Sequence, residues 1–164
     1  MKRLFQSIFA GSVVLLALAA CSGDDESDTK KDTTMPVIES DENALPSNCQ
    51  VYYKGEVIPF RCLMSDNQEL GNYNIEIHHN FDHHTHSTDA GECELDAKKT
   101  PVHPWVYNQS FTIPQGSSTY DAQVDIPIPN DIDPGDYHFM IRLTDKAGWQ
   151  QLRAVSIKIK EKAN

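Results

Sequence analysis

The sequence predicts an all-β fold, a β-sandwich of about seven strands, and two observations support it. From Pro36 onward, apolar and polar residues alternate in short runs, which is typical of strands that bury one face. Gly, Pro, Asn and Asp interrupt these runs at short intervals, and no segment sustains a 3.6-residue apolar period over ten positions. Short strands separated by frequent turns favour two packed sheets over a helical or mixed fold.

The alternation also places each strand along the chain. In the best-defined run, Ile75 and Ile77 share one face with His79, while Glu76 and His78 share the other. Three later runs alternate in the same way, with apolar positions Tyr120, Ala122, Val124, Ile126 and Ile128, then Tyr137, Phe139, Ile141 and Leu143, then Val155, Ile157 and Ile159. We predict strands near residues 56–64, 73–79, 105–113, 119–128, 137–144 and 152–160.

Two short motifs refine the fold class. Residues 133–137, DPGDY, resemble the D-x-G-x-Y corner of immunoglobulin-like domains, in which a tyrosine leads strand F. Residues 144–148, TDKAG, resemble the turn into the last strand of many bacterial immunoglobulin-like modules. The resemblance implies an Ig-like or fibronectin-like sandwich, in which the six predicted ranges become strands B, C, D, E, F and G. It implies nothing about function, because one fold carries many functions.

The first 21 residues resemble the signal of a bacterial lipoprotein. A basic start is followed by a short apolar run over residues 8–18 and by LAAC, which ends at Cys21. The resemblance implies that residues 1–20 are removed as a signal peptide, that Cys21 is lipidated, and that the protein is anchored to a membrane without spanning it. Ser22 and the acidic residues 24–26 further imply the outer membrane, with export to the cell surface.

Composition divides the remainder into a tether and one domain. Residues 21–35 contain few apolar side chains, so we expect a lipidated, acidic and disordered tether. Residues 36–164 are long enough for a single core. Loss of Lys2 and Arg3 with the signal peptide moves the formal net charge from −10 to −12. This balance argues against nucleic-acid binding, which needs clustered Lys and Arg.

Three cysteines lie in the predicted domain, in a compartment that permits disulfides. The sequence around Gly55 predicts a hairpin, and a hairpin centred between Gly55 and Glu56 places Cys49 opposite Cys62. We therefore expect a Cys49–Cys62 disulfide, with Cys49–Cys93 and Cys62–Cys93 as the alternatives. The expected pair leaves Cys93 as a buried or bridged thiol, or as a soft ligand beside the histidines.

Five of the seven histidines of the chain fall within residues 78–86, HHNFDHHTH. His78 ends the predicted strand C, and His138 begins the predicted strand F. These strands are antiparallel neighbours in an Ig-like sandwich, so the two residues become cross-strand neighbours with β-carbons about 5 Å apart. The loop that leaves this point can fold back over the pair, and it carries Asp82, His83, His84 and His86.

This arrangement predicts a metal site, because neutral imidazole is the commonest metal ligand and several imidazoles suit zinc or copper. The candidate ligands are His78, His83, His84, His86, His138 and Asp82. Asp82 either ligates directly or orients a histidine by accepting its second N–H. Spacing leaves open which loop pair binds. His79 points inward by parity, and His103 is isolated in a loop, so neither is a preferred ligand.

The segments IEIHHNFDHHTH, GDYHF and LTDKAG together resemble a family of Ig-like bacterial lipoproteins with a histidine-rich loop, a domain of unknown function. The resemblance spans most of residues 36–160, and the histidine segment is its most distinctive part. It implies a fold and a location, but no chemistry.

We therefore expect a non-enzymatic, lipid-anchored protein with a histidine-rich zinc or copper site. The alternative is an adhesion module that binds a glycan or a protein partner, in which exposed Trp105, Tyr107 and Trp149 form a platform and any metal is structural or absent. A metallohydrolase is disfavoured, because the sequence has no H-E-x-x-H and no G-x-S-x-G. Histidine ligation also predicts that metal affinity falls as the pH drops through about 6.5.

Overall fold

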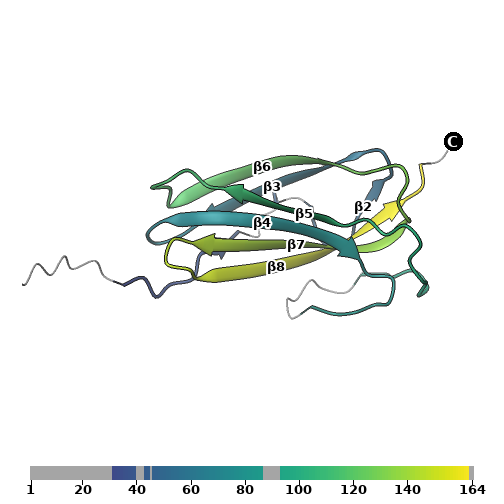
Figure 1. Cartoon of the computed structure of the whole chain (residues 1–164), viewed down its shortest axis with the longest axis horizontal. Helices are drawn as coiled ribbons and strands as arrows, with labels where there is room; N and C mark the ends of the chain where they lie inside the picture. The colour runs from purple at the N-terminus through teal and green to yellow at the C-terminus, as the bar shows by residue number, and fades with distance from the viewer. Residues whose placement is uncertain (1–30, 40–42, 45, 87–92, 163–164) are drawn as a thin grey trace, which may run out of the picture. The chain divides into compact units, whose positions relative to one another are not determined.

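The alternating runs form two open β-sheets that pack face to face (Figure 1). The structure is a computed structural model that describes residues 31–39, 43–44, 46–86 and 93–162. Within these ranges the chain forms eight strands and no helix. The strands are β1 Val37–Ile38, β2 Gln50–Tyr53, β3 Val57–Ser65, β4 Leu70–His79, β5 Tyr107–Thr112, β6 Thr119–Pro127, β7 Gly135–Asp145 and β8 Gln150–Lys160. The predicted all-β sandwich is thus confirmed.

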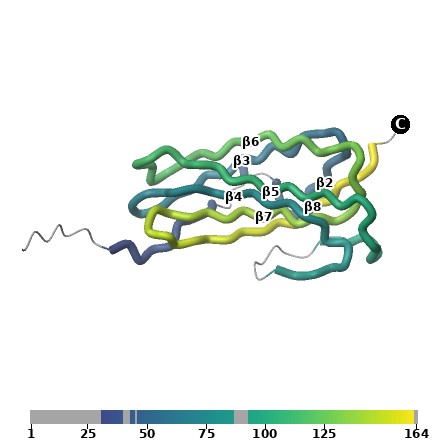
Figure 2. Tube along the Cα trace, viewed as in Figure 1, coloured from purple at the N-terminus to yellow at the C-terminus, as the bar shows by residue number. Residues whose placement is uncertain are grey.

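One sheet contains three strands in the order β1-β3-β6, and the other contains five in the order β2-β8-β7-β4-β5. The tube view shows the same two layers, with β3 and β6 on one side and β4, β7 and β8 on the other (Figure 2). Neighbouring long strands pair antiparallel in continuous register, from Val57↔Pro127 to Ser65↔Thr119 in one sheet and from Asn72↔Thr144 to His79↔Tyr137 in the other. The central pair of the larger sheet, β4 and β7, positions the histidines.

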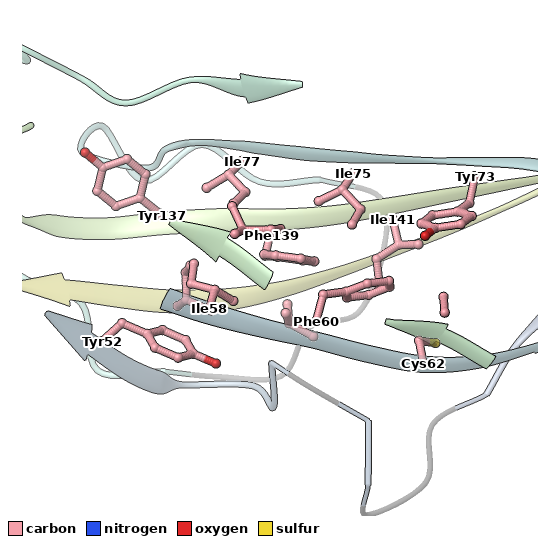
Figure 3. Close-up of a cluster of buried hydrophobic side chains, with 14 of the residues drawn as sticks. Tyr52, Ile58, Phe60, Cys62, Tyr73, Ile75, Ile77, Tyr137, Phe139 and Ile141 are labelled. Carbon is pink, nitrogen blue, oxygen red and sulfur yellow. The ribbon is translucent and has the colours of Figure 1, made fainter. Parts of the chain in front are cut away.

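The core lies between the sheets and is formed by the inward residues of the predicted alternation (Figure 3). Phe60 of β3 stacks on Phe139 of β7, with ring centroids 5.7 Å apart, and so joins the two layers. Ile75 and Ile77 of β4 are fully buried beside them. Each large apolar side chain buried in this way contributes roughly 1.5–3 kcal/mol of transfer free energy. The core therefore fixes which residues of β4 and β7 face outward.

The strand near residues 105–113 was predicted correctly in position, but its label as strand D is wrong. Strand D of an Ig-like domain lies in the sheet opposite strand C. Here β5 pairs antiparallel with β4, from Asn72↔Thr112 to Ile77↔Tyr107, and forms an edge of the five-stranded sheet. The main-chain hydrogen bonds to β4 determine to which of the two sheets β5 belongs. The alternation of residues along β5 does not predict this, because a strand of either sheet can show it.

The expected Cys49–Cys62 disulfide is also wrong, because residues 50–65 do not form a hairpin. β2 pairs in parallel with β8, whereas β3 belongs to the other sheet. A turn with Gly55 at φ +76° carries the chain from one sheet to the other. Cys49 instead bonds to Cys93, with α-carbons 5.5 Å apart, which was one of the alternatives. Cys62 is a thiol buried in the core, and its Sγ lies 3.5 Å from the carbonyl oxygen of Leu63.

The tyrosine that leads β7 fixes the end of the sandwich that carries the histidines. The Tyr137 hydroxyl donates a hydrogen bond of 2.6 Å to the carbonyl oxygen of Asp133. The Asp133 carboxylate in turn accepts from the backbone N–H groups of Val102 and His103, at 2.7 and 2.8 Å. This network holds the long β4–β5 connection against the start of β7.

The N-terminal predictions fall largely outside the described residues. Residues 1–30, including the predicted signal peptide and Cys21, are not described. Asp32, which the composition assigned to the tether, is 8% exposed, and its carbonyl oxygen accepts a 3.0 Å hydrogen bond from Trp149 Nε1. In the part of the chain that the structure describes, no helix has the length and apolar character needed to cross a membrane.

Candidate metal centre

His78 and His138 face each other on the neighbouring strands β4 and β7, near one end of the larger sheet, as predicted. The register of β4 and β7 makes them direct partners, and their ring centroids lie 5.5 Å apart. Both side chains point away from the core, because Ile77 and Phe139 occupy the inward positions beside them. The strand pairing therefore creates a pair of imidazoles on a rigid surface.

The loop after β4 folds back over this pair, because Phe81 anchors it. Phe81 is 2% exposed and meets the Tyr137 ring edge-on, with centroids 5.4 Å apart. The N–H of Asn80 donates to the carbonyl oxygen of Asp136 at 2.8 Å, which ties the loop to the start of β7. His83 adopts φ +60°, a left-handed conformation that reverses the chain. His84 and His86 consequently return over β4.

Three imidazole nitrogens converge in this arrangement. His78 Nε2 lies 3.0 Å from His86 Nε2 and 3.3 Å from His84 Nε2. One ring nitrogen from each of the three residues lies within 4.8 Å of the other two. Two nitrogen ligands at about 2.0–2.1 Å from a tetrahedral zinc ion are themselves about 3.3 Å apart. The spacing of the nitrogens thus matches a shared metal ion with only small adjustments.

Two carboxylates lie behind the imidazoles and orient them. Asp82 Oδ1 accepts a hydrogen bond from His84 Nδ1 at 2.6 Å, so the lone pair of His84 Nε2 faces the cluster. This bond lowers the pKa of Asp82 to about 2. Glu76 Oε1 lies 3.0 Å from His78 Nδ1, although the angle does not make a hydrogen bond, and it pairs with the ring electrostatically. Asp82 thus bonds to His84 and is not part of the group whose ligand atoms converge.

The lone pair of His84 Nε2 faces the Nε2 atom of His78, which can share a cation with it or donate a proton to it. With Nδ1–H of His84 directed at Asp82, the Nε2 atoms of His84 and His78 approach each other to 3.3 Å. Burial, opposed by the Glu76 carboxylate, lowers the pKa of His78, and burial also lowers the pKa of His86. Both rings are thus mainly neutral near pH 7, which is the form that ligates metal.

His138 contacts the loop histidines, but its ring nitrogens are not among the three that converge. It is 6% exposed, and its Nε2–H donates to the carbonyl oxygen of His84 at 3.2 Å. Its ring meets the His86 ring edge-on, with centroids 4.5 Å apart. Burial lowers the pKa of His138 to about 4, so the ring is neutral at pH 7. We assign it a positioning role, because it holds both loop histidines above His78.

The other histidines lie away from the cluster. The reversal at His83 turns its ring outward, where Nε2–H donates to the carbonyl oxygen of Asp96 at 2.9 Å, so the structure does not bring this candidate to the site. The His79 ring lies tilted against Phe81, with centroids 4.9 Å apart, away from the three converging nitrogens. His103 is exposed, and its backbone N–H is bonded to Asp133.

The sequence did not single out Glu76 and Phe81 as parts of the site. Glu76 sits two residues before His78, and the two-residue period of a strand is the signal that puts both on one face. Phe81 carried a weaker signal, as a lone aromatic residue in a polar loop. The three aromatic residues of the predicted platform do not share a face. Trp105 is 7% exposed and packs near Tyr137, whereas Trp149 follows the opposite end of β7.

The fold and the cluster define a β-sandwich protein with three converging imidazoles at one end of its larger sheet. The chain belongs to the family described as Domain of unknown function (DUF4625), whose sequence model matches residues 19–160. Among solved structures it is similar to Spo0M, a sporulation control protein from Bacillus subtilis, at 14% identity and a TM-score of 0.34. That match covers 79% of this chain and 48% of the Spo0M chain. No curated protein matches the sequence.

Proposed function

We propose that this protein is a non-enzymatic lipoprotein, anchored to the outer membrane through Cys21, that binds one zinc or copper ion through His78, His84 and His86. The convergence of three imidazole nitrogens within 4.8 Å is the observation that carries the proposal. Neutral imidazole binds zinc and copper well, whereas magnesium and calcium prefer oxygen ligands. The ion would occupy the space between the converging ring nitrogens of His78, His84 and His86.

Two features favour binding over catalysis. The two carboxylates nearest the cluster, Glu76 and Asp82, each lie against an imidazole and are not directed at a free coordination position. A catalytic zinc needs an open position together with a base that can reach the bound water. The loop is also fixed by a buried aromatic anchor and by main-chain bonds. This rigidity suits an ion that is held rather than one that turns over a substrate.

The test is metal content measured on the untagged full chain. After dialysis against trace zinc and copper, inductively coupled plasma mass spectrometry should find one ion per chain. The variant His84→Ala/His86→Ala should lose it. His83→Ala is the matched control, because it removes a histidine of the same loop that lies outside the converging set, and it should retain the ion. Metal-free wild-type protein, or equal metal in both variants, would reject the proposal.

A further inference from the structure

Three carboxylates meet at the end of the sandwich opposite the histidines. Asp66 directly follows β3, Asp145 is the last residue of β7, and Asp32 lies in the segment before β1. Each offers an oxygen within 4.8 Å of the oxygens of the other two. Figure 1 shows the arrowhead of β7 and the purple N-terminal segment at one end, while β4 points to the other end. The cluster therefore joins parts of the chain that are distant in sequence.

Two of the carboxylate oxygens are buried without a partner. Asp145 is 4% exposed, and neither its Oδ2 nor Oδ1 of Asp66 has a hydrogen-bond partner among the described residues. The other oxygens are used: Thr34 N–H donates to Asp32 Oδ1 at 2.9 Å, Gln68 and Glu69 N–H donate to Asp66 Oδ2 at 2.8 and 2.9 Å, and Trp149 N–H donates to Asp145 Oδ1 at 2.8 Å. Backbone bonds thus fix one oxygen of each group and leave Oδ1 of Asp66 and Oδ2 of Asp145 without a donor.

Positive side chains do not neutralise the cluster. Among the described residues, the ion pairs of Lys, Arg and His all involve carboxylates other than Asp32, Asp66 and Asp145. A buried ionised carboxylate without a counter-ion and with one oxygen unbonded is unfavourable, and three together repel one another. A bound cation removes both costs at once.

We propose that Asp32, Asp66 and Asp145 bind a Ca²⁺ ion. The donors are oxygens only, which suits a hard cation and not the zinc or copper proposed for the imidazoles. Calcium lies about 2.4 Å from its ligands, so three oxygens that are mutually about 4.2 Å apart or closer can all contact one ion. The oxygens here lie within 4.8 Å of one another, so at most a small closure of the cluster is needed. Magnesium requires about 2.1 Å and near-ideal octahedral geometry, which a set drawn from three separate segments satisfies less readily.

The ion would connect the N-terminal segment to both sheets. Asp66 extends from β3 of the three-stranded sheet, Asp145 belongs to β7 of the five-stranded sheet, and Asp32 lies outside both. The hydrogen bond from Trp149 Nε1 to the carbonyl oxygen of Asp32 already holds that segment beside the β7–β8 turn. Calcium would therefore decide how firmly residue 32 is held against the domain.

Calcium titration of the full chain tests the proposal, after treatment with a chelator. Isothermal titration calorimetry should give one Ca²⁺ per chain, and at a hundred times the dissociation constant the melting temperature should rise by about 5–10 °C. Asp145→Asn keeps the shape and the acceptor for Trp149 N–H but removes the charge, so it should abolish the calcium-dependent rise. Asp32→Asn should do the same.

Asp131→Asn is the matched control, because Asp131 is exposed and outside the cluster, and it should respond to calcium like the wild type. An unfolded Asp145→Asn protein would be recognised by its circular dichroism, and Asp32→Asn would then decide. Lack of any calcium response in the wild type, an equal response to Mg²⁺, or an intact response in both variants would overturn the assignment. His84→Ala/His86→Ala should keep the full response, so this site and the histidine site can fail independently.

Discussion

At the scale of single residues, the cluster depends on hydrogen bonds that set which imidazole nitrogen faces inward. His84 shows this most clearly, because its two ring nitrogens contact different groups, Asp82 on one side and His78 on the other. A carboxylate that fixes a ring in this way raises the basicity of the opposite nitrogen and removes the need to reorient it on binding. In the proposed metal site, Asp82 would thus affect metal affinity without touching the ion.

Asp82→Ala should weaken zinc binding about ten- to a hundredfold, because His84 loses its orienting acceptor. Competition with a zinc indicator dye would measure the change. Asp82 is exposed, so chemical denaturation of the metal-free protein should show little difference from the wild type. Asp82→Asn retains an acceptor and should lose less affinity. Equal affinity in Asp82→Ala and the wild type would rule out the orienting role.

His138 makes the stability of the metal-free protein depend on pH. Its pKa is about 4 in the folded chain and about 6.5 when unfolded, so the unfolded chain binds more protons between these values. The contribution of His138 to the free energy of unfolding is therefore at its maximum above pH 6.5. It falls as the pH drops toward 4, by an amount on the order of 3 kcal/mol. The lowered pKa values of His78 and His86 act in the same direction.

Urea unfolding in a chelating buffer at pH 7 and pH 4.5 would measure this loss. His138→Gln should flatten the pH dependence, since Gln does not titrate in this range. The exposed His103 provides the control, and His103→Gln should keep the wild-type dependence. A pH dependence in His138→Gln as steep as that of the wild type would contradict the assignment.

At the scale of elements, the disulfide links the start of β2 to the connection that follows the histidine loop. Cys49 and Cys93 are 44 residues apart, and the loop that they close contains β2, β3 and β4. A cross-link of this span restricts the unfolded chain and stabilises the folded one by about 4 kcal/mol in the chain-entropy view.

Cys49→Ser/Cys93→Ser should therefore lower the free energy of unfolding by about 2–5 kcal/mol. Guanidinium unfolding monitored by tryptophan fluorescence would measure it. A reducing agent should destabilise the wild type by a similar amount and leave the double variant unchanged. If the reducing agent has no effect on the wild type, the bond does not contribute to stability.

The limits of sequence reasoning also appear at the scale of elements. The pairing of His78 with His138 was predictable, because long alternating runs fix which face is buried and the order of strands C and F fixes the neighbour. The Cys49–Cys93 pair was not, because the four-residue strand β2 carries no pattern that assigns it to β8. His83 could not be distinguished from His84 and His86, because spacing in a loop does not fix where side chains point and the turn at φ +60° appears only in the structure.

At the scale of the whole molecule, the two ends of the sandwich differ in chemistry. One end gathers imidazoles around the start of β7, and the other gathers carboxylates at its last residue. The second cluster escaped prediction because Asp32, Asp66 and Asp145 belong to no local motif and meet only after the sheets pack. The single strand β7 thus connects two sites whose ligand types suit different ions.

The direct opposition of His78 and His138 also bears on how the chain avoids misfolding. A slip of one residue between β4 and β7 would turn His78 inward and Ile77 outward, because successive side chains point to opposite faces. The same error would damage the core and disperse the three imidazoles. An ion that binds only the assembled cluster would stabilise the native register and would not stabilise a register shifted by one residue. Metal binding would then favour the native alignment of β4 and β7 over shifted alignments.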